Sequence, residues 1–203
     1  MAAMALLTIA CAAQAQRRFD AAVFAGANFN QLDGDDDGGF NHIGLRAGVG
    51  TSFSLTTAAD SPLRLGVELA FSQKGSTISS SFERRATLSY VEIPVMLSLS
   101  LFDSRLRLSA GVAPALLVKA SVIQGGSHNT AQERNYLRFD RLPLVLTARY
   151  LFTDHWALEA RWQNSFLTVC EQSASGTYRI FRDNKGVFPR TVTLGIAYNL
   201  FNR

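Results

Sequence analysis

Residues 105–116 read Arg-Leu-Arg-Leu-Ser-Ala-Gly-Val-Ala-Pro-Ala-Leu, and their side chains alternate between two kinds. The even positions hold leucine, alanine, valine or proline, and the odd positions hold arginine, serine, glycine or alanine. Successive side chains of a β-strand point to opposite faces, so a period of two is typical of a strand between two environments. The stretch therefore predicts a strand with one apolar face and one polar or small face.

The same alternation recurs along most of the chain and predicts further strands. Each predicted strand holds ten or more residues, whereas strands of soluble proteins average about 5 or 6 and a tilted membrane strand needs about 9 to 11. This length favours a membrane barrel over a sandwich. The eight predicted strands are residues 20–30, 43–55, 63–74, 87–101, 105–119, 138–151, 155–167 and 189–201.

The predicted connections alternate between long and short. The long ones, 31–42, 75–86, 120–137 and 168–188, each exceed ten residues and are polar, and the others, 56–62, 102–104 and 152–154, have seven residues or fewer. Transmembrane barrels have long outer loops and short periplasmic turns. We therefore predict an all-β, eight-stranded, antiparallel, up-and-down transmembrane barrel with four long outer loops.

The polar faces indicate which side of each strand faces the lumen and which side faces lipid. In a membrane barrel the apolar face meets lipid and the polar face fills the lumen, which in eight strands is about wide enough for side chains to fill. Charges there need pairing, so we expect a plugged network and expect Glu92→Ala to strand an arginine. The alternative is that these charges form the solvent face of a soluble sheet. The predicted lumen network is Arg46, Arg64, Glu68, Glu92, Arg105, Arg107, Arg149, Glu159 and Arg161.

The amino terminus predicts export. Residues 1–13 are apolar and uncharged, and Ala13-Gln14-Ala15 fits a signal-peptidase site. We expect a signal peptide over residues 1–15 and a barrel domain over 16–203. A lipoprotein site at Cys11 and a buried amino-terminal helix are the alternatives, and Cys170 is expected to be an inert thiol.

The composition excludes several classes of protein. Of the 203 residues 47% are hydrophobic and 18% charged, so the chain can bury a large apolar surface and is not expected to be disordered. It has no run approaching the roughly 18 apolar residues of a spanning helix. The net charge of +4 comes without a basic run, so no nucleic-acid partner is expected.

The first long loop contains an acidic motif. Asp33, Asp35, Asp37 and Gly38 match positions 1, 3, 5 and 6 of a calcium-binding EF-hand loop, but position 12 is Gly44 instead of glutamate. A weak Ca²⁺ site is the alternative to an acidic, solvated loop, and no other cofactor is expected.

Histidine is scarce, and its placement argues against an enzyme. Ser127 and His128 are adjacent in a predicted loop, and adjacent residues of an extended chain point in opposite directions, so they do not form a catalytic dyad by themselves. His155 begins a strand at the side of the short turns, where lipid A chemistry does not occur. His42 lies near the top of the second strand. We therefore expect a non-enzymatic protein, with an outer-membrane lipid-modifying enzyme as a remote alternative.

Four segments resemble the PorT-type outer-membrane β-barrel family of Gram-negative bacteria. They are SQKG at residues 72–75, LSYVEIPV at 88–95, LSAGVAP at 108–114 and the closing LGIAYNLF at 194–201. The resemblance covers essentially the whole mature chain and implies an eight-stranded barrel in the outer membrane. The partners expected there are outer-membrane lipid and lipopolysaccharide, the barrel-assembly machinery during insertion, and a secretion-system or surface protein.

The expected function is a structural or interaction role through the surface loops. A narrow pore or an accessory component of a secretion or transport assembly is the first alternative. A soluble periplasmic barrel that binds a hydrophobic ligand is a further one, and it requires the two faces to be reversed.

Overall fold

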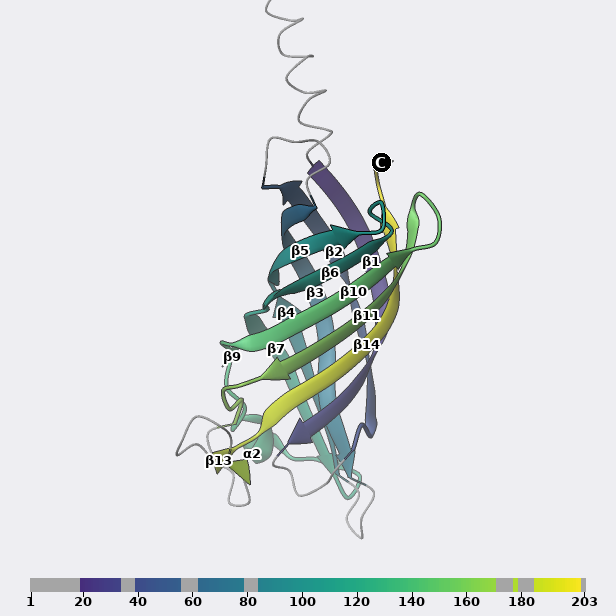
Figure 1. The fold of residues 1–203 in the computed structure, drawn as a ribbon. Coiled ribbons are helices and arrows are strands. Elements are labelled where there is room, and N and C mark those ends of the chain that lie inside the picture. Colours follow the sequence, from purple (N-terminus) through teal and green to yellow (C-terminus); the bar gives the residue numbers. More distant parts are fainter. Residues whose placement is uncertain are drawn as a thin grey trace, which may run out of the picture.

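The computed structural model describes residues 19–33, 39–55, 62–78, 84–170, 177–178 and 185–201. Over these residues the chain forms a closed antiparallel β-barrel (Figure 1). The predicted signal peptide and Cys11 lie outside them. No helix in the described part of the chain is long and apolar enough to cross a membrane.

Five of the barrel's eight strands are continuous, and three are interrupted. The continuous ones are β1 (Phe19–Asp33), β2 (His42–Ser54), β3 (Leu63–Ile78), β11 (Trp156–Ser165) and β14 (Phe188–Asn199). The interrupted ones are β4 (Arg84–Glu92) with β5 (Val95–Leu101), β6 (Leu106–Val112) with β7 (Ala115–Gln124), and β9 (Phe139–Asp140) with β10 (Pro143–Leu151).

Two of the interruptions coincide with prolines. Pro94 and Pro114 have no backbone N–H, so each removes one donor from the ladder. Their carbonyl groups still accept hydrogen bonds from neighbouring strands, from Glu68 N–H at 2.9 Å and from Ile93 N–H at 3.0 Å. The sheet therefore continues across the interruptions, and each interrupted pair acts as one strand of the barrel.

Neighbours in sequence pair around the barrel, and β14 closes it against β1. The closing register pairs Ala22 with Asn199 and Asp33 with Phe188. An even number of strands brings the start of β1 and the end of β14 to one end (Figure 1), which we call the inner mouth. The opposite end is the outer mouth. The predicted fold class is confirmed.

The outer connections are shorter than predicted because the strands continue into them. Pairs such as Gly75 with Thr87 and Ser76 with Ala86 extend β3 and β4 through most of the predicted loop 75–86. Predicted loop 120–137 holds the end of β7, the short strand β8 (Ser127–His128) and helix α2 (Thr130–Glu133), where the Asn129 side chain accepts a hydrogen bond from Gln132 N–H. A separate hairpin, β12 (Thr177–Tyr178) and β13 (Lys185–Gly186), lies within predicted loop 168–188.

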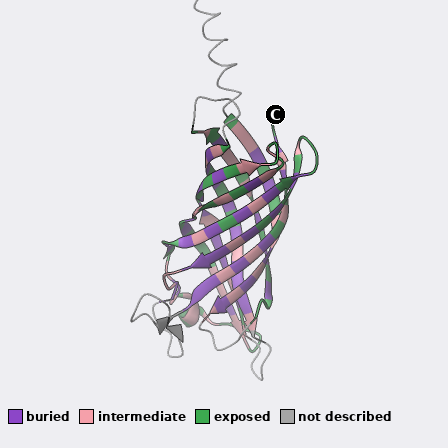
Figure 2. Cartoon of the chain, viewed as in Figure 1, coloured by how far each residue is buried: buried purple, intermediate pink, exposed green. Residues whose placement is uncertain are grey.

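The barrel is apolar outside and polar inside, the reverse of a soluble protein. Ile43, Leu45 and Leu158 are 69%, 63% and 54% exposed, whereas Arg161, Lys74 and Glu92 are among the largest fully buried side chains. Exposed and buried residues alternate along much of the barrel wall (Figure 2), with exceptions at the outer ends of β4, β7 and β11. The exposed band therefore faces lipid, and the polar faces fill the bore.

Gly48 makes room for an aromatic ring inside the bore. A Cβ atom there would lie 2.3 Å from the Leu69 carbonyl oxygen and 2.7 Å from Cζ of Phe24, whereas at Gly66 the nearest atom would be 3.5 Å away. We expect Gly48→Ala to lower the free energy of unfolding by about 1–3 kcal/mol through overpacking. Gly66→Ala, the same change on the neighbouring strand, should be nearly neutral. Urea unfolding of the barrel in detergent measures both, and equal losses would contradict the packing argument.

Candidate functional site: the filled bore

Five charged side chains meet at mid-height in the bore and form what we call the central cluster: Arg46, Glu68, Arg149, Glu159 and Arg161. They come from β2, β3, β10 and β11. Arg46 donates to Glu68 at 2.6 Å and to Glu159 at 2.8 Å. Arg149 also bridges both glutamates, and Arg161 reaches Glu68 at 3.1 Å. Each carboxylate thus holds more than one guanidinium group, and the walls of the barrel are tied together through the bore.

An aromatic ring supports this cluster from β1. The guanidinium carbon of Arg46 lies 4.1 Å from the centroid of the Phe24 ring, and that of Arg149 lies 6.0 Å away. A cation above a ring face is attracted by the ring's quadrupole. Phe24 is buried, so the ring also excludes water from one side of the cluster.

A second group, the outer cluster, lies nearer the outer mouth and consists of Lys74, Glu92, Asp140, Gln163 and Ser165. Lys74 Nζ lies 2.8 Å from Glu92 and 3.8 Å from Asp140. Gln163 donates to Glu92 at 3.0 Å, and Ser165 donates to Asp140. The Lys74 ammonium also lies 5.1 Å from the centroid of the Tyr90 ring.

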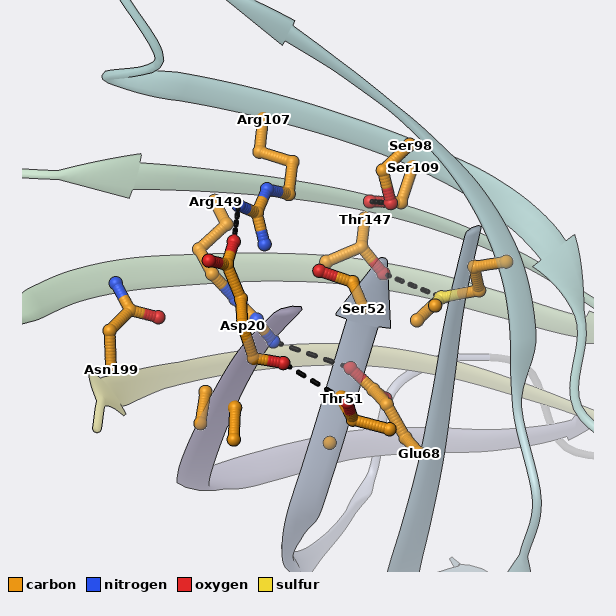
Figure 3. Close-up of a pocket in the computed structure, with 15 residues that line it drawn as sticks. Asp20, Thr51, Ser52, Glu68, Ser98, Arg107, Ser109, Thr147, Arg149 and Asn199 are labelled. Atoms are coloured by element: carbon orange, nitrogen blue, oxygen red, sulfur yellow. Dashed lines mark hydrogen bonds and ion pairs between the residues drawn. The ribbon is translucent and has the colours of Figure 1, made fainter. Parts of the chain in front are cut away.

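A third group, the inner cluster, lies at the inner mouth. Asp20 accepts from Arg107 at 2.8 Å and pairs with Arg64 at 3.3 Å. Figure 3 shows Arg107 reaching Asp20, with Arg149 of the central cluster nearby reaching Glu68. The cavity between these levels has a volume of about 30 Å³, which is room for only a few water molecules.

Uncharged polar side chains line the outer half of the bore on β1, β3 and β14. Asn28 donates to Ser72 at 3.0 Å and accepts from Thr193 at 2.7 Å. Asn30 accepts from Thr191 at 2.9 Å. Asn30 also donates to the His42 carbonyl oxygen on β2 at 3.3 Å. Buried amides are costly unless bonded, and these bonds tie β1 to both of its neighbours in the wall and across to β3.

The outer mouth is covered by an apolar cap. Tyr136, Val169 and Cys170 come from the outer connections, and Tyr136 and Cys170 form an isolated β-bridge. They pack on inward-facing residues of the outer strand ends. The cap consists of Leu32, Ala86, Leu88, Tyr90, Ala115, Val122, Tyr136, Val169, Cys170 and Val187.

The family model for the outer membrane protein beta-barrel domain matches residues 12–167, more than half of the chain. This chain belongs to that family. Such barrels lie in the outer membrane of Gram-negative bacteria. The location agrees with the exposed apolar band, because the bilayer solvates that surface and the bore keeps the charges.

Two solved outer-membrane proteins resemble this outer-membrane barrel in structure. Ail, the attachment invasion locus protein of Yersinia pestis, solved with the heparin analogue sucrose octasulfate, has a TM-score of 0.48 at 10% identity and covers 90% of this chain and 99% of its own. Neisserial surface protein A has a TM-score of 0.47 at 15% identity and covers 90% and 96%. No curated protein matches the sequence.

The bore of this outer-membrane barrel holds eight of the nine residues that alternation assigned to the network. Arg105 is the exception. It lies exposed in the turn before β6, because residues 102–104 adopt the positive φ angles of a turn and β6 begins at Leu106, one residue later than predicted. The partner expected for Glu92 was also wrong, since a lysine holds it instead of an arginine.

Three charged residues of the bore were missed in the sequence: Asp20, Lys74 and Asp140. Each lies at or near the end of a predicted strand, where alternation is weakest as a signal. Lys74 is the last residue of the predicted strand 63–74, and parity places it on the face of Arg64 and Glu68, so alternation could have found it. Asp140 lies beside the interruption after β9, and nothing in the local pattern marks it.

The acidic loop motif lies only partly within the described residues. Asp33 ends β1 and pairs with Arg190 at 3.0 Å. Asp35 and Asp37 lie outside the described part of the chain. Within that part no three side chains of His, Cys, Asp or Glu form a metal-binding group, and the calcium site remains a prediction.

The three histidines have partners of different kinds. His42 Nδ1 lies 3.1 Å from the Thr77 hydroxyl, and His155 Nδ1 lies 2.9 Å from the Asn199 carbonyl oxygen. His128 is exposed and lies 3.5 Å from Glu133. The Val122 N–H, which donates to Glu133 at 3.0 Å, lowers the pKa of that partly buried carboxyl group and favours its charged form. Glu133 thereby fastens α2 to β7.

Proposed function

We propose that this protein is a non-conducting outer-membrane barrel that catalyses no reaction and acts through the surface formed by its outer loops. The observation that supports the proposal is the filling of the bore at successive heights. Ion pairs occupy the inner mouth and the middle of the bore. The lysine and carboxylates of the outer cluster lie closer to the outer mouth, and the apolar cap covers that mouth.

The charges in the bore nearly balance, which favours a permanent plug. The inner, central and outer clusters together contain six cations and five carboxylates within the described residues. A buried pair that loses one partner costs about 3–5 kcal/mol. Opening a water path would separate several such pairs at once, so we expect the closed form to dominate.

The motif LSYVEIPV supports the finer assignment to PorT-type barrels. Its glutamate is Glu92 of the outer cluster, and its proline is Pro94, which interrupts β4 and β5. The motif thus combines a lumen charge with a strand break. The partners that we propose are outer-membrane lipid and lipopolysaccharide, the assembly machinery during insertion, and a secretion-system or surface protein that contacts the outer loops.

Planar-bilayer recording tests the closed bore. We expect the purified barrel to insert without stepwise ion conductance, because the paired and buried side chains of the central cluster occupy the bore at mid-height. A variant with Arg46, Glu68, Arg149 and Glu159 all changed to serine keeps the charge of the bore constant and removes its bulk, so it should conduct more than the natural protein. Regular conductance steps from the natural barrel would contradict the proposal and favour a narrow pore.

A further inference from the structure

Basic and apolar side chains gather on the outer surface where β7 meets β9. Four apolar residues there are exposed, with Phe139 at 57% and Val118 at 55%. Exposed basic residues flank them. We call this group the junction patch, and it consists of Leu116, Val118, Lys119, Arg138, Phe139, Arg141 and Leu142.

A β-bulge creates one side of the patch. Ser89 pairs with Lys119 and Tyr90 pairs with Leu117, so Val118 is an extra residue without a cross-strand partner. Leu117 and Ala120 pack on the apolar cap inside. Val118 and Lys119 are therefore both directed outward, and an apolar side chain stands next to a cation. Bulges commonly redirect side chains in this way.

The interruption between β9 and β10 creates the other side. Phe139 pairs with Leu116 across the two strands, and Asp140 points into the bore. Arg141 and Leu142 follow in the interruption, and both are exposed. The irregular backbone again places a cation beside apolar side chains at the lipid-facing surface.

The cations of the patch form no ion pair with a described carboxylate, although the charge of Lys119 helps to lower the pKa of Glu133 in the outer connection. Among the residues that the structure describes, no ion pair joins Lys119, Arg138 or Arg141 to an acidic side chain. The cations of the bore, in contrast, are paired. The patch is also continuous with the lipid-facing band through Val112 and Leu146, which are exposed on the same strands. An occupant must thus supply both negative charge and apolar surface.

We infer that the junction patch binds a phosphate-bearing lipid of the outer leaflet. Acyl chains pack on Leu116, Val118 and Phe139, and Lys119 and Arg141 donate charge-assisted hydrogen bonds to the phosphate oxygens. A soluble anion would leave the apolar residues of the patch without a contact, and an acidic peptide would not extend into the lipid-facing band. The inference places the lipid partner proposed above, but it does not depend on the closed bore.

Binding of lipid A tests the inference. The folded barrel in detergent is titrated with micelles that contain bisphosphorylated lipid A, and bound lipid is counted by native mass spectrometry. Lys119→Gln and Arg141→Gln should each weaken binding about tenfold, because each removes a charge-assisted hydrogen bond. Arg105→Gln is the matched control, since it removes an exposed arginine at the inner mouth, and it should bind as the natural protein does.

Two further measurements distinguish binding of the whole lipid from binding of its phosphate alone. Phe139→Ser should also weaken lipid binding, and inorganic phosphate should not displace the lipid. Unchanged binding in Lys119→Gln and Arg141→Gln, an equal loss in Arg105→Gln, or displacement by phosphate alone would overturn the inference. Conductance reports the bore and not the patch, so the failure of one proposal is distinguishable from the failure of the other.

Discussion

Glu68→Ala is expected to lower the free energy of unfolding by about 3–5 kcal/mol, because it leaves buried cations without a partner. Glu68 accepts from Arg46, Arg149 and Arg161, and all four side chains are nearly or fully buried. After the change the central cluster would hold three guanidinium groups and a single carboxylate, Glu159. Urea unfolding in detergent, followed by the shift of the folded band on an unheated gel, measures the loss.

Two further variants show whether the loss is electrostatic. Asp154→Ala removes an exposed carboxylate from the turn between β10 and β11 and should change stability by less than about 0.5 kcal/mol. Adding Arg161→Met to Glu68→Ala restores the natural difference of one positive charge in the cluster. Met96 Sδ already lies 3.9 Å from the Arg161 guanidinium, so an apolar side chain finds contacts there. If this second change gives no recovery, the cost of Glu68→Ala comes from lost packing.

The faces of the strands were predictable because the bilayer and the bore impose opposite demands on adjacent residues. Arg46, Glu68 and Arg161 each sit among apolar neighbours, and a period of two assigns them all to one side. That argument uses local sequence alone. It yields the strands, their approximate bounds and most of the lumen residues.

The partners inside the bore were not predictable in the same way. Arg46 and Glu159 are 113 positions apart, and their contact depends on the stagger of every strand between them. The pairing of Glu92 with Lys74 instead of an arginine follows from the same stagger. A one-residue change of register would send each side chain to the other face.

The apolar cap and the junction patch also required the structure. Both depend on irregular backbone, namely the bulge at Val118, the interruption at Arg141 and the bridge between Tyr136 and Cys170. The alternation of side chains predicts regular strands and gives no signal for such irregular sites. The features of the outer half that are most relevant to binding are therefore those that the periodic pattern cannot show.

Lys74→Met should destabilise the barrel to a similar extent, by about 3–5 kcal/mol, for the opposite electrostatic reason. Lys74 is the cation of the outer cluster, and its removal leaves Glu92 and Asp140 as two buried carboxylates close together. Methionine keeps most of the length and the apolar stem, so lost volume contributes little. Unfolding in urea, as for Glu68→Ala, measures the loss.

Lys119→Met is the matched control, because it makes the same change at an exposed position on β7 and should be nearly neutral in detergent. Combining Lys74→Met with Glu92→Gln removes one of the two stranded charges and should recover much of the lost stability. Gln163, which donates to Glu92, can donate equally to the new amide oxygen. Equal stability of Lys74→Met and Lys119→Met would show that the outer cluster is solvated through the cap. The outer cluster would then no longer count as part of the plug.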